Sequence, residues 1–150
     1  MSLDIITSSP GETLALGRKF AALLTAGDIV LLSGRLGSGK TLFVSGVGEG
    51  LGIGDRVTSP SFVISRIYRD GFLPMVHADV YRLGSIAEFE DLELTDDSAD
   101  GVLFVEWGET VADSLGDDRL DIHIDIEGDT RRFRFEPTGT WRDRDLGVLV

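Results

Sequence analysis

The feature that most constrains this chain is a glycine-rich segment placed between an apolar run and a helix candidate. The run Ile29–Leu32 leads into Gly34-Arg35-Leu36-Gly37-Ser38-Gly39-Lys40-Thr41, which matches the pattern G-x-x-x-x-G-K-[ST] of a phosphate-binding loop. Glycines let consecutive backbone N–H groups point at phosphate oxygens, and a following helix adds its unpaired amides and positive dipole end. A glycine-rich turn that carries Lys-Thr by chance is the alternative, and the helix candidate Lys40–Leu51 favours the phosphate loop.

The motif predicts roles for the two polar side chains at the end of the loop. Lys40 would reach the β- and γ-phosphates of a nucleotide, and the Thr41 hydroxyl would hold Mg²⁺. The predicted nucleotide-binding residues are Leu36, Gly37, Ser38, Gly39, Lys40, Thr41 and Leu42.

A second apolar run ends in an acid. Residues 101–105 are continuously apolar, which is typical of a strand buried on both faces, and Glu106 follows them. An acid at this position has the Walker-B pattern, and in a parallel sheet the carboxyl end of the strand lies beside the phosphate loop. The alternative is a strand capped by a solvated glutamate.

Three polar residues alternate along the segment that follows Leu73. His77, Asp79 and Tyr81 share one face of a strand, and an acid at a strand end near phosphates would serve Mg²⁺ directly or through water. The alternatives are a core histidine with satisfied hydrogen bonds and an aspartate that caps a loop or forms a salt bridge.

A proline surrounded by hydroxyl groups marks a candidate switch. In a nucleotide enzyme, Thr58, Ser59, Pro60 and Ser61 could line the γ-phosphate and order when the nucleotide binds. An ordinary Ser/Pro turn into a strand explains the same residues.

The remaining periodicity predicts one α/β domain over residues 1–150. Ser9 and Pro10 start a helix that Gly27 ends, and an antiparallel hairpin is inserted before His77. The tail after about residue 138 is expected to be loosely attached, with two charged pairs. The other expected elements are strands at Leu3–Thr7, Phe62–Arg69, Leu73–Ala78, Leu120–Glu127 and Arg131–Glu136, and helices at Ile86–Asp91 and Glu109–Leu115.

Composition excludes several classes of protein. The 14 basic and 26 acidic residues give a net charge of −12, which disfavours broad contact with bare nucleic acid. The absence of Cys excludes a thiolate nucleophile and a disulfide framework. No signal peptide or membrane span is apparent in the sequence, so a cytoplasmic protein is expected. A regulatory GTPase is disfavoured because the chain has no Asn to read guanine and no Gln to orient water.

The motifs together resemble the TsaE (YjeE) family of small bacterial ATPases. The resemblance runs from about Thr13 to Leu115 and weakens beyond Leu120. It departs from the family at Arg35, where an acid is usual, at Ser38, which replaces a common Ala, and at Leu42, which replaces a second Thr. The matching segments are residues 16–17, 27–28, 36–41, 57–62, 77–82, 88–94 and 105–107.

The resemblance implies a fold, an activity and partners. The fold is the three-layer α/β fold of phosphate-loop NTPases, with a central parallel sheet flanked by antiparallel strands. The activity is ATP hydrolysis with Mg²⁺ in the formation of threonylcarbamoyladenosine in tRNA. Asp79 and Glu106 would be catalytic, and Thr41 and Glu106 would bind the metal. The partners would be the TsaD and TsaB proteins, with tRNA contacted only through them and no membrane involved.

Two rival functions are weighed against this one. A small phosphotransferase would need an acceptor pocket and usually an arginine-bearing lid, and no Arg-rich segment sits at that position. A nucleotide-gated binding module would make hydrolysis incidental. The acidic segment Glu88–Asp97 and the loop mouth at Arg35 are candidate docking surfaces, although a charge run is more often a solvated face.

Overall fold

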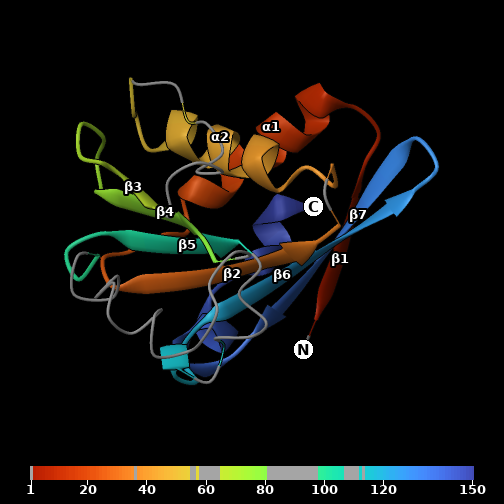
Figure 1. The fold of residues 1–150 in the computed structure, drawn as a ribbon. Helices are drawn as coiled ribbons and strands as arrows, with labels where there is room; N and C mark the ends of the chain where they lie inside the picture. Colours follow the sequence, from red (N-terminus) through yellow and green to blue (C-terminus); the bar gives the residue numbers. More distant parts are fainter. Residues whose placement is uncertain are drawn as a thin grey trace.

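The computed structural model describes residues 2–35, 37–54, 57, 65–80, 98–106, 112 and 114–150 of the chain. Its centre is a seven-stranded sheet in the order β1-β7-β6-β2-β5-β4-β3 (Figure 1). The strands are β1 (Leu3–Thr7), β2 (Asp28–Gly34), β3 (Ser65–Tyr68), β4 (Met75–Asp79), β5 (Val102–Glu106), β6 (Leu120–Glu127) and β7 (Thr130–Pro137).

The middle of the sheet is parallel and its two ends are antiparallel. Strands β6, β2, β5 and β4 run parallel to one another, while β7, β1 and β3 pair antiparallel with their neighbours. This arrangement confirms the predicted fold class, including the antiparallel hairpin before His77. Parallel pairing matters for function because it brings the carboxyl ends of β2, β5 and β4 to one edge.

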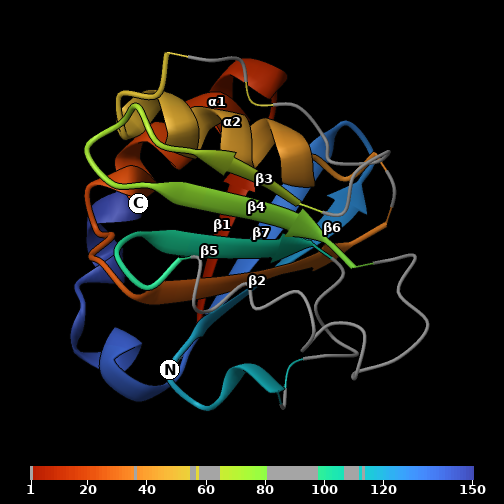
Figure 2. The same ribbon diagram turned by 60° about the vertical axis from the view of Figure 1, so that its left-hand side comes forward.

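Helices α1 (Pro10–Ala21) and α2 (Lys40–Gly50) cover the same face of the sheet (Figures 1 and 2). The start of α1 is as predicted: Pro10 occupies the first turn, and the Glu12 amide donates to Ser9 Oγ at 3.1 Å. Among the described residues, neither helix is long and apolar enough to cross a membrane.

The predicted end of α1 at Gly27 is wrong. The helix ends at Ala21. A turn follows, in which the Leu24 amide donates to the Ala21 carbonyl three residues earlier at 3.2 Å. The Asp28 carboxylate accepts a hydrogen bond from the Thr25 amide at 2.7 Å, which turns the chain into β2. Gly27, with a φ of 91°, therefore serves this turn and not the helix.

The two helices cross so closely that backbone meets backbone. A Cβ atom added at Gly17 of α1 would lie 2.4 Å from the Phe43 carbonyl oxygen of α2. A Cβ atom added at Gly46 of α2 would lie 2.3 Å from the Leu14 carbonyl oxygen of α1. No side chain fits at either position without displacing the other helix, so both glycines are required by the crossing itself.

Apolar side chains pack on both faces of the central strands of the sheet. The larger cluster lies under the helices and joins α1 and α2 to the strands through rings such as Phe20, Phe43 and Phe133. The smaller cluster, on the opposite face, includes Leu31, Leu103 and Val105 from the central strands. The helix and acidic loop expected over residues 86–97 lie outside the described residues.

The expectation of a loosely attached tail is wrong. The 3₁₀ helices η2 (Gly139–Asp143) and η3 (Leu146–Leu149) bring Trp141 and Leu149 into the core, and the Trp141 ring stacks on Phe20 with centroids 5.7 Å apart. Arg144 donates to both carboxylate oxygens of Asp28 at 2.6 Å and lies over the Trp141 ring. The sequence showed charged pairs within the segment, but Arg144 pairs with β2 instead.

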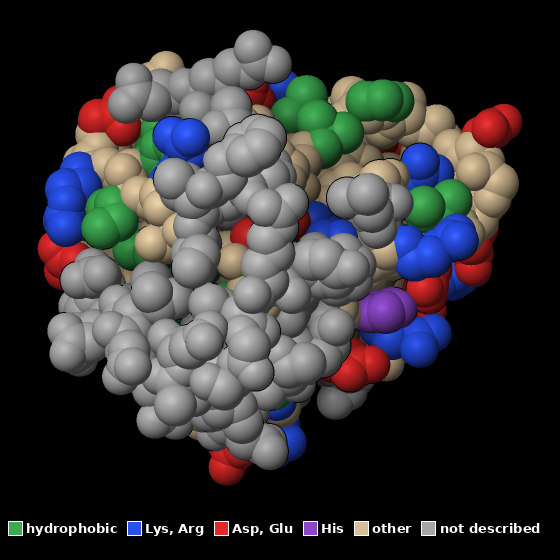
Figure 3. All heavy atoms as spheres, viewed as in Figure 1, with side chains coloured by type: hydrophobic (Ala, Val, Ile, Leu, Met, Phe, Trp, Pro, Cys, Tyr) green, Lys and Arg blue, Asp and Glu red, His purple; other side chains and the backbone are tan. Residues whose placement is uncertain are grey.

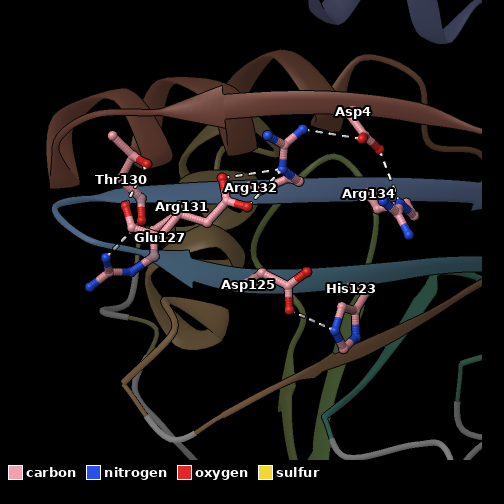
Figure 4. Close-up of polar contacts among 8 residues, drawn as sticks. All are labelled: Asp4, His123, Asp125, Glu127, Thr130, Arg131, Arg132 and Arg134. Atoms are coloured by element: carbon pink, nitrogen blue, oxygen red, sulfur yellow. Dashed lines mark hydrogen bonds and ion pairs between the residues drawn. The ribbon is translucent and has the colours of Figure 1, made fainter.

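On β1, β7 and β6, the face of the sheet turned away from the helices is polar, and several of its charged side chains form ion pairs (Figure 4). Asp4 accepts hydrogen bonds from Arg132 at 3.3 Å and from Arg134 at 3.2 Å, and Arg132 also reaches Glu127. These contacts lower the pKa of Asp4 and raise the pKa of both arginines. In the space-filling view, basic side chains near β6 and β7 are interspersed with acidic ones (Figure 3).

Candidate functional site

The candidate site lies where three parallel strands end side by side. In the register of the sheet, Glu106 at the end of β5 stands beside Leu32 of β2 on one side and Asp79 of β4 on the other. Strand β2 continues past Leu32 to Gly34 and enters the phosphate loop. Because strand residues alternate between faces, Glu106, His77 and Asp79 project on the side of the sheet that the helices cover.

The phosphate loop curls back over the end of β2. Gly37 and Gly39 have φ values of 82° and 108°, which residues with a side chain rarely adopt, and Gly39 is the N-cap of α2. The first turn of α2 contains no acidic residue, and its N-cap provides no side-chain hydrogen bond. The N-terminal end of α2 thus presents backbone donors and a positive dipole end suited to an anion.

Lys40 turns inward toward its own loop. It is 5% exposed, and its Nζ donates to the Gly34 carbonyl at 2.6 Å and to the Arg35 carbonyl at 3.2 Å. These contacts satisfy a buried ammonium group that would otherwise be costly to desolvate. The lysine is therefore held at the loop by groups that a phosphate could replace as acceptors.

Glu106 connects the helix to the neighbouring strand. It is 3% exposed, Thr41 Oγ1 of α2 donates to its Oε2 at 3.3 Å, and Nε2 of the fully buried His77 contacts the same oxygen. Both of these contacts reach the same carboxylate oxygen, Oε2. His77 is thus both a core residue, as one sequence interpretation had it, and a member of the polar constellation.

The donor set at this point is made of hard oxygens. The Thr41 hydroxyl and the Glu106 carboxylate lie together, and the Asp79 carboxylate belongs to the adjacent position of β4. Within the described residues, no three His, Cys, Asp or Glu side chains form a cage for a metal ion. That arrangement suits Mg²⁺, which usually takes one or two carboxylates and completes its shell with water and phosphate oxygens.

A cavity of about 350 Å³ opens elsewhere, on the opposite face of the sheet, and His123 and Ser33 line it. Ser33 Oγ lies 2.7 Å from His123 Nδ1, and His123 Nε2 lies 3.0 Å from Asp125 Oδ1. The order of contacts resembles a catalytic relay. However, Ser33 lies within the paired strand β2, and the carboxylates of Asp121 and Glu136 border the same cavity, so an oxyanion would be disfavoured there.

Another cavity, of about 280 Å³, adjoins the phosphate loop and involves residues that the sequence did not suggest. The loop forms one wall of it, and the other walls come from the segment before α1 and from the β6–β7 turn. Asp129 and Arg131 were predicted only as parts of a hairpin, so nothing local linked them to the loop. The lining residues are Thr7, Ser8, Ser9, Pro10, Thr13, Gly37, Ser38, Gly39, Leu42, Asp129 and Arg131.

Ser38 gives this cavity an unused polar group. Its side chain is 1% exposed, and its Oγ has no hydrogen-bond partner among the described residues. Buried hydroxyls are normally paired, so an unpaired one beside a cavity indicates a place for a ligand atom or water.

Part of the predicted site lies outside the described residues. This holds for Leu36 of the loop, for the candidate switch Thr58, Ser59, Pro60 and Ser61, and for Tyr81. The structure brings together Lys40, Thr41, His77, Asp79 and Glu106, with Gly37, Ser38, Gly39 and Leu42 on the cavity wall.

Sequence comparison identifies a family whose model matches most of the chain. Residues 7–133 match the sequence model of the family described as "Threonylcarbamoyl adenosine biosynthesis protein TsaE". A protein of Streptomyces coelicolor named tRNA threonylcarbamoyladenosine biosynthesis protein TsaE is 52% identical over 145 residues, covering 90% of this chain and 97% of the relative. A Bacillus subtilis protein of the same name is 44% identical, covering 84% of this chain and 79% of the relative.

A solved structure shares the fold as well. The crystal structure of YdiB from Bacillus subtilis superimposes with a TM-score of 0.79 at 35% identity, covering 95% of this chain and 90% of that one. The family match spans the phosphate loop, the ends of β4 and β5, and the β6–β7 turn that borders the cavity. The chain therefore belongs to the TsaE family.

Proposed function

We propose that this protein binds ATP with Mg²⁺ and hydrolyses it slowly, as an accessory protein in the formation of threonylcarbamoyladenosine in tRNA. The observation that carries the proposal is the convergence of the phosphate loop, Thr41 and Glu106 at the carboxyl edge of the parallel strands. The names of its relatives place them in that tRNA modification.

The loop and Lys40 would bind the phosphates. The backbone amides at the start of α2 would donate to phosphate oxygens, and Lys40 would exchange the Gly34 and Arg35 carbonyls for the β- and γ-phosphates. The exchange replaces neutral acceptors by charged ones, and hydrogen bonds to charged groups are the stronger kind.

The acids would serve the metal and the attacking water. Thr41 and Glu106 would hold Mg²⁺, and Asp79 and Glu106 would orient the water for attack on the γ-phosphate. The bound metal would neutralise charge that develops on the phosphate oxygens. The burial of Glu106 excludes bulk water from that point, which strengthens its electrostatic effect.

The nucleoside would occupy the cavity beside the loop. Its walls offer Thr7, Arg131 and the Oγ of Ser38, which has no partner among the described residues, and it adjoins the loop that would hold the phosphates. The volume of about 280 Å³ is near the lower end of the range for small-molecule sites.

Partners would complete the activity. The chain has no Gln to orient water, and groups of that kind, or an arginine supplied in trans, can be worth several powers of ten in rate. The net charge of −12 and the pairing of Arg132 and Arg134 with acids disfavour direct binding to tRNA. TsaD and TsaB proteins would therefore provide both the stimulation and the contact with tRNA.

The test compares the protein alone with the protein in the presence of partners. ATPase activity is measured with and without purified TsaB–TsaD, and binding to bare tRNA is measured across salt concentrations. We expect slow hydrolysis alone, stimulation by the partners and weak tRNA binding. Fast hydrolysis by the isolated protein, or tight tRNA binding at physiological salt, would contradict the proposal.

A further inference from the structure

His77 is a polar residue in the middle of a buried strand. Its neighbours Val76 and Ala78 are fully buried on the opposite face of the sheet, and the histidine itself is 0% exposed on the helix side. Burying an imidazole without hydrogen bonds costs free energy, so its retention there calls for a specific partner. The partner within the described residues is Glu106, through Nε2.

The two nitrogens of the ring have different surroundings. Nε2 faces a carboxylate oxygen, which can only accept, so Nε2 carries the proton. Nδ1 is buried with no hydrogen-bond partner among the described residues. Within the described residues the ring therefore makes one hydrogen bond, from Nε2–H to Oε2 of Glu106.

The exposed histidine of the chain shows the contrast. Both ring nitrogens of His123 have partners, Ser33 on one side and Asp125 on the other, and the side chain is 49% exposed. His77 instead directs a single donor at a single oxygen inside the fold. Its geometry is that of a residue that orients another side chain.

We propose that His77 is the positioning residue for the metal-binding carboxylate: its Nε2–H holds Oε2 of Glu106 so that Oε1 faces the metal. The inference rests on the proposed function, because it assumes that Glu106 binds Mg²⁺. The second donor to Oε2, Thr41, is itself expected to bind the metal, so His77 supplies the hydrogen bond that persists when Thr41 turns to Mg²⁺. Partners of this kind, behind the ligands, typically contribute about ten- to hundredfold to metal affinity.

Two substitutions of similar size separate this role from simple packing. In His77→Gln, the side-chain amide nitrogen occupies the place of Nε2 and keeps a donor toward Glu106. In His77→Asn, the amide nitrogen occupies the place of Nδ1, and the donor toward Glu106 is lost. Both variants place an uncharged amide in the same space, so a purely structural role predicts similar behaviour.

The measurement is the affinity of the ADP complex for Mn²⁺, followed by electron paramagnetic resonance. We expect His77→Asn to weaken Mn²⁺ binding about ten- to hundredfold and His77→Gln to stay within about threefold of the unsubstituted protein. Affinity for a fluorescent ATP analogue in EDTA should be the same in all three. Equal losses in the two variants, or no loss in either, would overturn the proposal.

A second measurement covers the case in which His77→Asn fails to fold. The chain contains only two histidines, so the ¹⁵N spectrum of the imidazole rings is assigned with a single His123→Gln variant. We expect His77 to carry hydrogen on Nε2 in the nucleotide-free protein, and a ring with hydrogen on Nδ1 only would overturn the inference. Failure of the unsubstituted protein to bind nucleotide would overturn the proposed function first, so the two failures are distinguishable.

Discussion

The two halves of the molecule differ in how completely their polar side chains are paired. In the first half, around β1, β7 and the C-terminal segment, charges have partners. Arg144 donates to both carboxylate oxygens of Asp28, and Asp4 accepts hydrogen bonds from two arginines. In the second half, at the carboxyl ends of β2, β5 and β4, buried polar side chains lie close together. Within the described residues, Ser38 Oγ and His77 Nδ1 lack any partner.

The difference teaches where stability and binding are located. An ion pair at the edge of a core stabilises the folded state, and its hydrogen-bonding groups are already used within the protein. Unused buried acceptors and donors cost free energy in the empty protein, which a ligand can recover. Substitutions in the first half should therefore alter unfolding, while substitutions in the second half should alter nucleotide chemistry.

The largest expected effect tests the first half. Trp141→Ala removes a ring that is 1% exposed and stacked on Phe20, so we expect a loss of about 3–5 kcal/mol in the free energy of unfolding, measured in urea. The control is Val148→Ala in the same segment, where the side chain is 54% exposed and the change should be within about 0.5 kcal/mol. Equal, small effects in the two variants would restore the idea of a loose tail.

The next effect tests the second half. Glu106→Gln and Asp79→Asn each remove a charge that should act on the metal or the attacking water, so turnover of ATP should fall by about a hundredfold or more. Binding of a fluorescent ATP analogue should stay within about threefold, since transition-state interactions weigh little in the ground state. Glu49→Gln on α2, whose exposed carboxylate pairs with Arg18, is the control. Normal turnover in either site variant would remove that acid from the catalytic role.

A comparable but smaller effect concerns binding itself. Lys40→Ala removes a charge-assisted hydrogen bond to a phosphate, worth about 1.5–3 kcal/mol, so ATP affinity should fall about ten- to hundredfold. The control is Lys19→Ala, which alters the chain's only other lysine, exposed on α1. If titration gave the same dissociation constant for both variants, the phosphate-loop assignment would be wrong.

The smallest effect depends on pH and belongs to the first half. The pKa of Asp4 is lowered from its ordinary value of 3.8, chiefly by its hydrogen bond with Arg134, so its ionised form stabilises the folded state. Asp4→Asn should lower Tm by about 1–2 °C at neutral pH, because the pairs are exposed. The difference should vanish as the pH falls from 3.8 through the lower pKa of the folded protein. Asp100→Asn in an exposed turn is the control, and a difference that persists at the acid end would exclude the ion pairs as its cause.

The sequence predicted best where local patterns and function coincide. The phosphate loop, the strand before it and the acid at Glu106 follow from short motifs whose geometry is dictated by the backbone. The parallel centre of the sheet follows from the same motifs, because a loop and an acid on neighbouring strands must share an edge.

The errors came from contacts between distant segments. Arg144 pairs with Asp28, which lies 116 residues away, and no local pattern reveals that pair or the burial of Trp141. The same distance hid Arg131, which reaches the cavity beside the loop from the far end of the chain. Gly27 was assigned to a helix end because a positive φ suits both a helix cap and a turn.

The crossing of α1 and α2 restricts which substitutions this sequence can accept during evolution. At Gly17 and Gly46 even alanine would bring a Cβ atom within 2.4 Å of a carbonyl oxygen of the other helix, so no single-step replacement is open at either position. Because α2 carries Lys40 and Thr41 at its start, any replacement that pushed the helices apart would also move those two side chains. Mutational scanning should therefore find these two glycines as intolerant as the loop residues themselves, although neither lines the cavity beside the loop.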